Sequence, residues 1–220
     1  MTNLTSPDDA KLTKTLLTCG MIAGPLYVIL GLIQMAIRPG FDITRHSLSL
    51  LANGDLGWIQ TLNFLITGIL LVAGAVGVKR TIQTGRGSRW APRMLGLYGL
   101  GLIGASIFSA DPALGFPPGT PLENNPISSH GLMHFVVGTI GFTGFIVTCF
   151  IFARRFKSLQ KPGWSSYSLI TGILFLASFV GIASGSKGPF SAFFAIAVVL
   201  GFTWISALLS NLKAGLAEGR

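Results

Sequence analysis

Long apolar runs separated by short polar loops dominate the chain. Six of them fall within the roughly 17–25 residues that cross the hydrocarbon layer of a membrane as an α-helix. None contains Asp, Glu, Lys or Arg, and they cover residues 16–37, 59–78, 94–110, 131–153, 167–184 and 190–209. Backbone polar groups in hydrocarbon must be satisfied within the segment, so each run predicts a helix. The pattern predicts an all-α polytopic membrane protein: a six-transmembrane-helix bundle in one domain (16–209) between polar tails (1–15 and 210–220).

Composition supports a membrane protein and argues against a soluble one. Only 10% of the residues are charged, against about 25% in soluble domains. The formal net charge is +9, but the basic residues occupy separate short loops, so no nucleic-acid partner is expected. Cys19 and Cys149 fall inside apolar runs and are expected to be small buried hydrophobes without a disulfide. No cleavable targeting segment is recognised, which favours a bacterial or archaeal plasma membrane.

The distribution of Lys and Arg predicts the orientation. Thirteen of the 16 such residues lie in the two tails and in the second and fourth loops, whereas Arg38, Arg45 and Lys187 lie on the opposite side. Loops rich in Lys and Arg remain in the cytoplasm. Both ends of the chain are therefore predicted to be cytoplasmic, the N-in/C-in arrangement.

Two long loops are predicted on the extracytoplasmic side. In the first, Asp42 or Thr44 is a candidate helix start and Asn53-Gly54 a helix stop, so a short interfacial helix is expected at about 42–52. The second, 111–129, is rich in Pro and Gly and is not expected to be helical. Its prolines and Phe116 favour an ordered lid over a flexible connection.

Polar residues recur at helical spacing near the extracytoplasmic ends of the predicted helices. Polar side chains inside a membrane usually face the interior of a bundle and mark function. Gly138 and Gly141 continue the face of the fourth helix that carries two histidines, and small residues mark helix contacts. We therefore expect an outward-facing polar pocket that binds a small molecule or a lipid head group. Its predicted residues are Gln34, His46, Gln60, Asn63, Asp111, His130 and His134.

His130 and His134 are one helical turn apart, close enough to share a metal ion. A zinc site needs at least one further ligand, which His46 or Asp111 would supply. However, the glutamate of the His-Glu-x-x-His pattern is missing. The competing interpretation is that both imidazoles lie at the start of the fourth helix and hydrogen-bond the lid. The expectation is a site without a cofactor, with zinc as the alternative.

The candidate catalytic residues are His46, Asp111 and His134. A nucleophilic arrangement would add Ser47 or Ser49 to His134 and Asp111, provided that the hydroxyl lies within hydrogen-bond reach of the base. Both serines are equally typical of an ordinary surface helix. Haem b would need histidines on facing helices, which a pair four residues apart does not provide. The residues alone do not decide whether the protein is an enzyme.

Six motifs stand out along the chain: Pro-Gly-Phe-Asp (39–42), His-Ser-Leu-Ser-Leu (46–50), Gly-Trp-Ile-Gln-Thr-Leu-Asn-Phe (57–64), Phe-Ser-Ala-Asp-Pro (108–112), Gly-Phe-Pro-Pro-Gly (115–119) and Ser-His-Gly-Leu-Met-His (129–134). They resemble the family catalogued as domain of unknown function 998. The likeness extends over nearly the whole chain, with the same helix count and loop order, although the hairpin 185–194 lacks a basic residue expected near Phe193. The resemblance implies an integral membrane protein and supplies no reaction.

A more distant similarity is to the ceramidase-like membrane hydrolases, which combine a His-x-x-x-His pair, another histidine, an aspartate and a serine around zinc. His130, His134, His46, Asp111 and Ser47 supply these residue types, although here His46 lies in a loop and the helix count is lower. The analogy implies the alternative function, a zinc-dependent hydrolase of a lipid-like amide or ester. The expected partners are the bilayer and a small molecule or lipid, and no protein partner is indicated.

Overall fold

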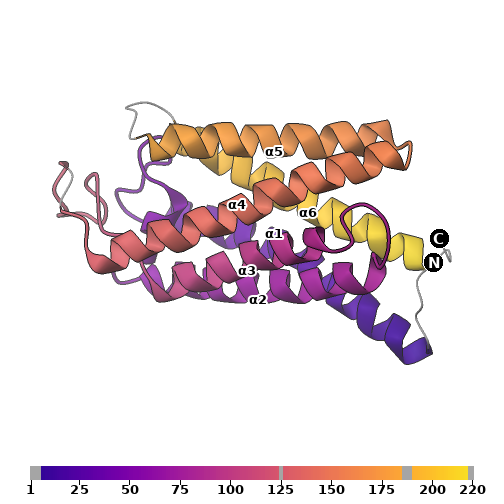
Figure 1. Cartoon of the computed structure of the whole chain (residues 1–220). Helices are drawn as coiled ribbons and strands as arrows, with labels where there is room; N and C mark the ends of the chain where they lie inside the picture. Colours follow the sequence, from indigo (N-terminus) through magenta and orange to yellow (C-terminus); the bar gives the residue numbers. More distant parts are fainter. Residues whose placement is uncertain (1–5, 124–125, 185–189, 218–220) are drawn as a thin grey trace.

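The computed structural model describes residues 6–123, 126–184 and 190–217. Within them, six long helices lie along one another as a bundle without a β-strand (Figure 1). This confirms the predicted all-α six-helix architecture. Lys187 and Arg220, two of the residues used to predict the orientation, lie outside the described residues. The helices are α1 (Pro7–Ile37), α2 (Gly57–Thr81), α3 (Trp90–Ile107), α4 (Ser129–Ser158), α5 (Pro162–Ala183) and α6 (Phe190–Ala217), with a short 3-10 helix, η1 (Leu48–Ala52), before α2.

Five of these helices, all except α3, are long and apolar enough to cross a membrane unaided. α3 has 18 residues, and Arg93 lies in its first turn. The apolar remainder rises about 21 Å at 1.5 Å per residue, less than the ~30 Å hydrocarbon layer. α3 packs between α2 and α4 over its length, so its place in the bundle depends on these two neighbours.

Each helix packs against the next along the chain, and α6 returns to α1 (Figure 1). Since successive helices alternate in direction, the connections gather at two ends of the bundle. The loop end carries the first loop (38–56) and the lid loop (108–128). The basic end carries the connections 82–89 and 159–161, together with the start of α1 and the end of α6.

Glycines bring the backbones of α1 to α4 into direct contact. A Cβ atom added at Gly20 would lie 2.8 Å from the Cα of Gly74, on α2. One added at Gly101, on α3, would lie 2.6 Å from the Cα of Gly141, on α4. Such close approach is how helices pack tightly in a membrane, where no hydrophobic effect drives them together.

Aromatic rings fill the space between α4, α5 and α6. The ring of Phe142 lies 5.4 Å from that of Phe175, 5.1 Å from that of Phe179 and 5.3 Å from that of Phe194, all in edge-on geometry. Edge-to-face pairs at these separations are favourable. The contacts around Phe142 are therefore made by side chains, whereas α1 and α2, and α3 and α4, also touch through their backbones.

Polar and apolar residues are distributed as lipid requires. Large apolar side chains such as Ile29 (55% exposed) and Ile69 (53%) project from the helices, whereas Gln60, Asn63 and Thr67 are fully buried. A water-soluble bundle would show the opposite distribution. The exposed apolar surface indicates that this bundle is embedded in a bilayer.

The helix expected at about 42–52 is shorter in the structure, where it is the 3-10 helix Leu48–Ala52. The preceding residues form a turn instead. The Asp42 carboxylate accepts hydrogen bonds from the N–H (2.9 Å) and the hydroxyl (2.7 Å) of Thr44. These bonds compete with a helical backbone, which is why aspartate favours turns.

Two leucines of η1 are buried, whereas an interfacial helix would have placed them on the membrane surface. Leu50 and Leu51 are buried in a small core with Ala110 and Phe116 of the lid loop, and Phe116 is completely buried. They therefore join the two loops instead of lying on the membrane surface.

Candidate functional site

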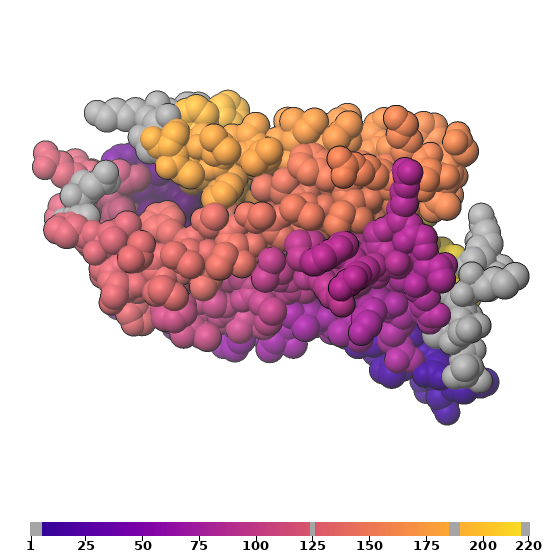
Figure 2. All heavy atoms as spheres, in the orientation of Figure 1, coloured from indigo at the N-terminus to yellow at the C-terminus, as the bar shows by residue number. Residues whose placement is uncertain are grey.

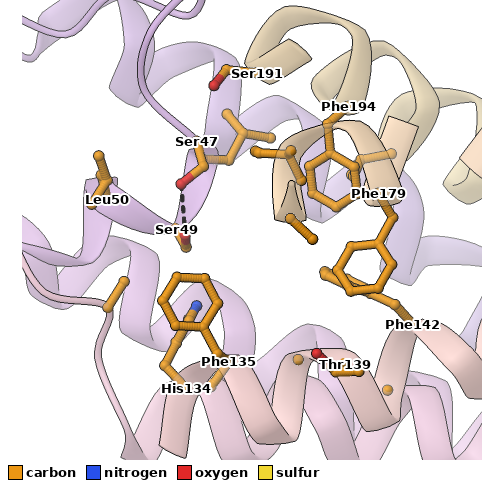
Figure 3. Close-up of a pocket in the computed structure, with 18 of the residues that line it drawn as sticks. Ser47, Ser49, Leu50, His134, Phe135, Thr139, Phe142, Phe179, Ser191 and Phe194 are labelled. Atoms are coloured by element: carbon orange, nitrogen blue, oxygen red, sulfur yellow. Dashed lines mark hydrogen bonds between the residues drawn. The ribbon is translucent and has the colours of Figure 1, made fainter. Parts of the chain in front are cut away.

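A cavity of about 540 Å³ lies at the loop end, between α3, α4, the adjoining parts of α5 and α6, and the two loops. Figure 2 shows the surface hollowed at this end, between the yellow start of α6 and the salmon-coloured α4. Figure 3 shows the lining side chains from close by. The volume lies within the 300–1,000 Å³ typical of small-molecule sites.

The lining has two chemically different parts. Serines from the first loop lie on one side, and Phe142, Phe179 and Phe194 lie on the opposite side (Figure 3). Tyr98 and Leu102 of α3 continue the apolar part of the lining. Polar groups contribute at the loop end: Arg45, Ser47, Ser49, Asp111, His134 and Ser191. The cavity is thus largely apolar with a polar rim, whereas the sequence suggested a polar pocket.

His134 lies in the second turn of α4 and lines this cavity. Its Nδ1 atom is 2.8 Å from the carbonyl oxygen of Phe108. A carbonyl only accepts, so Nδ1 carries the proton and Nε2 of the neutral ring has a free lone pair. Nε2 makes no hydrogen bond within the described part of the chain. His134 is therefore an oriented acceptor available to a ligand.

Asp111 lines the cavity too, but its carboxylate already binds Ser128. It accepts hydrogen bonds from the Ser128 N–H at 2.8 Å and from the Ser128 hydroxyl. The same hydroxyl accepts from the N–H of Gly131 at 3.0 Å and caps the start of α4. These bonds from the hydroxyl and the N–H hold the pKa of Asp111 below its ordinary value. Asp111 therefore fastens the lid loop to α4.

This carboxylate gives a pH-dependent prediction. Because the folded pKa of Asp111 is depressed, its contribution to stability is present above the unfolded value of about 3.9. It is lost as the pH falls through the folded pKa. Thermal unfolding should show the wild type more stable than Asp111→Asn by a constant margin from pH 7 to about 5. The margin should narrow as the pH falls below the unfolded value of about 3.9, and a margin that does not narrow there would contradict the assignment.

His46 lies in the first loop and is only 2% exposed. Its Nδ1 accepts from the N–H of Asp42 at 2.9 Å, and its Nε2 donates to the carbonyl of Leu114 at 3.0 Å. The ring lies 5.5 Å from those of both Phe41 and Phe116. With both nitrogens engaged, His46 joins the first loop to the lid loop and has no lone pair free for a metal.

Three predicted pocket residues form a separate network between α1 and α2. The Gln34 amide donates to Gln60 Oε1 at 2.8 Å, and the Asn63 amide donates to the same oxygen at 3.2 Å. All three side chains are fully buried and none lines the cavity. Tyr27 stands between them and the cavity, since it lines the cavity and its hydroxyl accepts from Gln60 at 3.5 Å.

Of the seven residues predicted to form the pocket, the structure brings only Asp111 and His134 to the cavity. His130 is exposed, and its ring contacts that of Phe108 at 5.7 Å. The aromatic part of the lining was not predicted. Its sequence signal was the spacing of Phe175 and Phe179, one turn apart on α5, but phenylalanines in an apolar run are also typical of lipid-facing positions.

Among the described residues, no group of three or more His, Cys, Asp or Glu side chains lies close enough together to hold a metal ion. Nor are the parts of a hydrolytic triad joined by hydrogen bonds there. The hydroxyls of Ser47 and Ser49 bond each other at 2.9 Å (Figure 3), and His134 is oriented by the Phe108 carbonyl instead of by Asp111. The arrangement suits binding better than proton transfer to a nucleophile.

The family model described as "Protein of unknown function (DUF998)" matches residues 21–211. No curated protein and no solved structure matches the chain significantly.

Proposed function

The chain belongs to the DUF998 family of proteins of unknown function, and from its cavity we propose that it binds an amphipathic, lipid-like small molecule. The apolar part of this ligand would lie among the rings of Phe142, Phe179 and Phe194, with its polar head at the rim of the cavity. One observation carries the proposal: a cavity of about 540 Å³ whose lining changes from aromatic to polar along its length.

Burial of the apolar part supplies most of the affinity, at roughly 25 cal/mol per Å² of apolar surface removed from water. The polar rim would orient the ligand. Arg45 lies there, donates to the Leu114 carbonyl at 3.2 Å and forms no ion pair among the described residues. Asp111 is ionised, but its carboxylate oxygens already accept hydrogen bonds from Ser128. Arg45 is therefore the cationic donor of the rim and favours a head group that accepts hydrogen bonds, such as a carboxylate.

The position of the cavity at the loop end supports access from outside the cell. The loops of this end carry few Lys and Arg residues, whereas those of the basic end carry many, and positively charged loops remain cytoplasmic. In this proposal the protein lies in the plasma membrane of a bacterial or archaeal cell and binds its ligand from the outer side or the outer leaflet.

Filling the cavity tests the proposal. Gly138 lines it, and a Cβ atom there would meet only Phe142, at 3.9 Å. Gly138→Phe should therefore occupy the cavity without moving a helix. We expect it to bind dansyl-labelled lauric acid in nanodiscs at least tenfold more weakly than the wild type, the equivalent of about 1.4 kcal/mol. The measurement is the fluorescence increase on titration.

The matched control is Gly215→Phe at the basic end of α6, where an added Cβ meets nothing within 4 Å; it should bind the probe as the wild type does. Equal binding by the Gly138→Phe variant, the control and the wild type would rule out this site. Wild-type preference for the acid over its methyl ester, reduced in Arg45→Gln, would identify the guanidinium as the head-group contact.

The alternative remains a zinc-dependent hydrolase of a lipid-like amide or ester. His130 and His134 on successive turns of α4 support it, whereas the engagement of both His46 nitrogens and of Asp111 speaks against a complete ligand set. Zinc analysis of the same preparations separates the two. Stoichiometric zinc that disappears in His134→Ala would favour the hydrolase over plain binding.

A further inference from the structure

A second cavity lies at the opposite end of the molecule, on the outer face of the bundle. It is a groove of about 510 Å³ between α2 and α3 at the basic end. Apolar side chains of both helices form its floor, among them Val76 (44% exposed) and Leu100 (56%). Lys79, Arg89 and Arg93 form its rim with Gln83 and Ser88. The groove therefore combines an apolar surface that faces lipid with a cluster of cations at the basic end.

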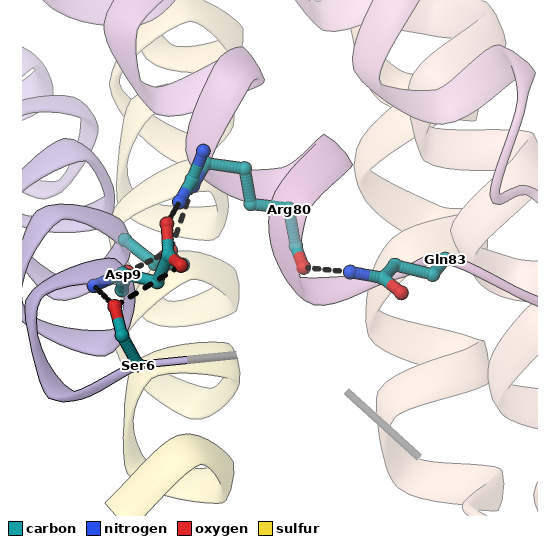
Figure 4. A network of polar contacts seen from close by, with 5 residues as sticks. Ser6, Asp9, Arg80 and Gln83 are labelled. Carbon is teal, nitrogen blue, oxygen red and sulfur yellow. Dashed lines mark hydrogen bonds and ion pairs between the residues drawn. The ribbon is translucent and has the colours of Figure 1, made fainter. Parts of the chain in front are cut away.

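These cations carry uncompensated charge. The ion pair found among the described residues is that of Arg80 with Asp9, at 2.6 Å, and Arg80 also donates to Thr13 (Figure 4). Arg80 is thereby turned away from the groove and neutralised. Lys79, next to it in sequence, has no carboxylate within ion-pair distance in this part of the structure, and the sequence contains no Asp or Glu between Asp55 and Asp111.

Trp90 places this rim at the membrane surface. The guanidinium carbons of Arg89 and Arg93 lie 5.7 and 5.6 Å from the centre of its ring, and its side chain is 55% exposed. Tryptophan is enriched at the boundary between hydrocarbon and water, and a guanidinium over its face is held there by a cation–π contact. The cations of the groove therefore lie at the depth of the lipid head groups.

We propose that this groove binds one anionic phospholipid of the leaflet at the basic end. Its phosphate would lie among Lys79, Arg89 and Arg93, and an acyl chain would follow Val76 and Leu100. Basic pockets between membrane helices are typical binding sites for anionic head groups. A nucleic acid or a soluble phosphate would leave the apolar floor unoccupied, whereas a phospholipid satisfies both parts of the groove. This site is independent of the cavity at the loop end.

The charge requirement is tested with Lys79→Gln, Arg89→Gln and Arg93→Gln combined. The protein is reconstituted in nanodiscs of phosphatidylglycerol and phosphatidylcholine, and the lipids it retains are counted by native mass spectrometry. We expect the wild type to retain one phosphatidylglycerol and the triple variant to lose at least tenfold in retention, because each basic residue removed weakens the attraction of an anionic head group. The control, Arg154→Gln, Lys157→Gln and Lys161→Gln, removes equal charge from the same end and should retain the lipid.

The groove itself is tested without changing charge. A Cβ atom at Gly96, in the lining, would lie at ordinary contact distance from Ala75, 3.6 Å, so the ring in Gly96→Trp should fill the groove. We expect the same loss of phosphatidylglycerol, with retention unchanged in Gly163→Trp, where an added Cβ meets nothing within 4 Å. Melting temperatures of all variants confirm folding.

Four results would overturn the proposal. Equal losses of phosphatidylglycerol in both triple variants would mean that the lipid is attracted to the basic end as a whole and not to the groove. Undiminished retention in Gly96→Trp would mean that no lipid enters the groove. Equal retention of phosphatidylcholine by the wild type would show that the cations do not select the lipid. A wild-type dimer that dissociates in Gly96→Trp would show that a second copy of the chain, not a lipid, occupies the groove.

Discussion

Gly101→Leu is expected to prevent formation of the bundle. A Cβ atom at this position would lie 2.6 Å from the Cα of Gly141 and 3.0 Å from the carbonyl oxygen of Val137. Both are backbone atoms of α4, so only separation of α3 from α4 relieves the overlap. Overpacking commonly costs about 1–3 kcal/mol and more where nothing yields, and α3 is the helix least able to remain in the membrane alone. We expect a loss above about 4 kcal/mol, which is exceptional for one substitution.

The measurement is the yield of monodisperse protein by fluorescence-detected size exclusion, with thermal unfolding where any protein is recovered. Gly138→Leu is the matched control, since it makes the same change on α4 in open space and should fold as the wild type. A Gly101→Leu variant as stable as this control would show that α3 and α4 do not meet at Gly141.

Arg38→Ala is expected to detach the two loops that roof the cavity. Arg38 is 7% exposed. Its guanidinium donates to the carbonyl of Leu51 at 2.9 Å and to that of Asn53, and its central carbon lies 5.1 Å from the centre of the Phe116 ring. Hydrogen bonds from a charged donor contribute roughly 1.5–3 kcal/mol each. Their loss should destabilise the loops locally by about 3–5 kcal/mol and expose the lid loop.

Limited proteolysis and hydrogen exchange of residues 108–128 measure this effect, and binding of the dansyl probe should weaken in parallel. Arg38→Lys keeps the charge but lacks the planar fork that reaches two carbonyls, so its lid loop should show intermediate protection. Arg154→Ala at the basic end is the control. Unchanged protection of the lid loop in Arg38→Ala would show that Phe116 and His46 hold the roof without it.

The helices were predictable because lipid imposes a simple requirement on the sequence. All six apolar runs correspond to helices. Their ends were less predictable, since helices continue beyond the hydrocarbon. α1 begins at Pro7, nine residues before the apolar run, where Ser6 caps it and Asp8 and Asp9 occupy the first turn. That start follows a known N-terminal pattern, but apolar content alone does not detect it.

The site was predicted only in part, for a physical reason. Spacing along a helix shows that Gln34, Gln60 and Asn63 face inward, but it does not show whether they meet a ligand or one another. The structure shows that they hydrogen-bond to one another, while the buried Gln34 Oε1 has no partner among the described residues. Distances between helices depend on which glycines of neighbouring helices contact each other, and the sequence does not show which pairs do. His134 was identified because an imidazole within an apolar run is costly in lipid and therefore faces the interior of the bundle.

The contrast between glycine contacts and aromatic contacts bears on how the proposed ligand would enter and leave the cavity at the loop end. Touching main chains, as at Gly20 with Gly74, leave nothing that can rotate aside. Phenylalanine rings turn about their side-chain bonds, and the rings around Phe142 line the cavity on the side of α5 and α6. For the proposed ligand, passage would therefore depend on rotation of these rings, whereas the glycine contacts of α1 with α2 and of α3 with α4 leave no side chain to rotate.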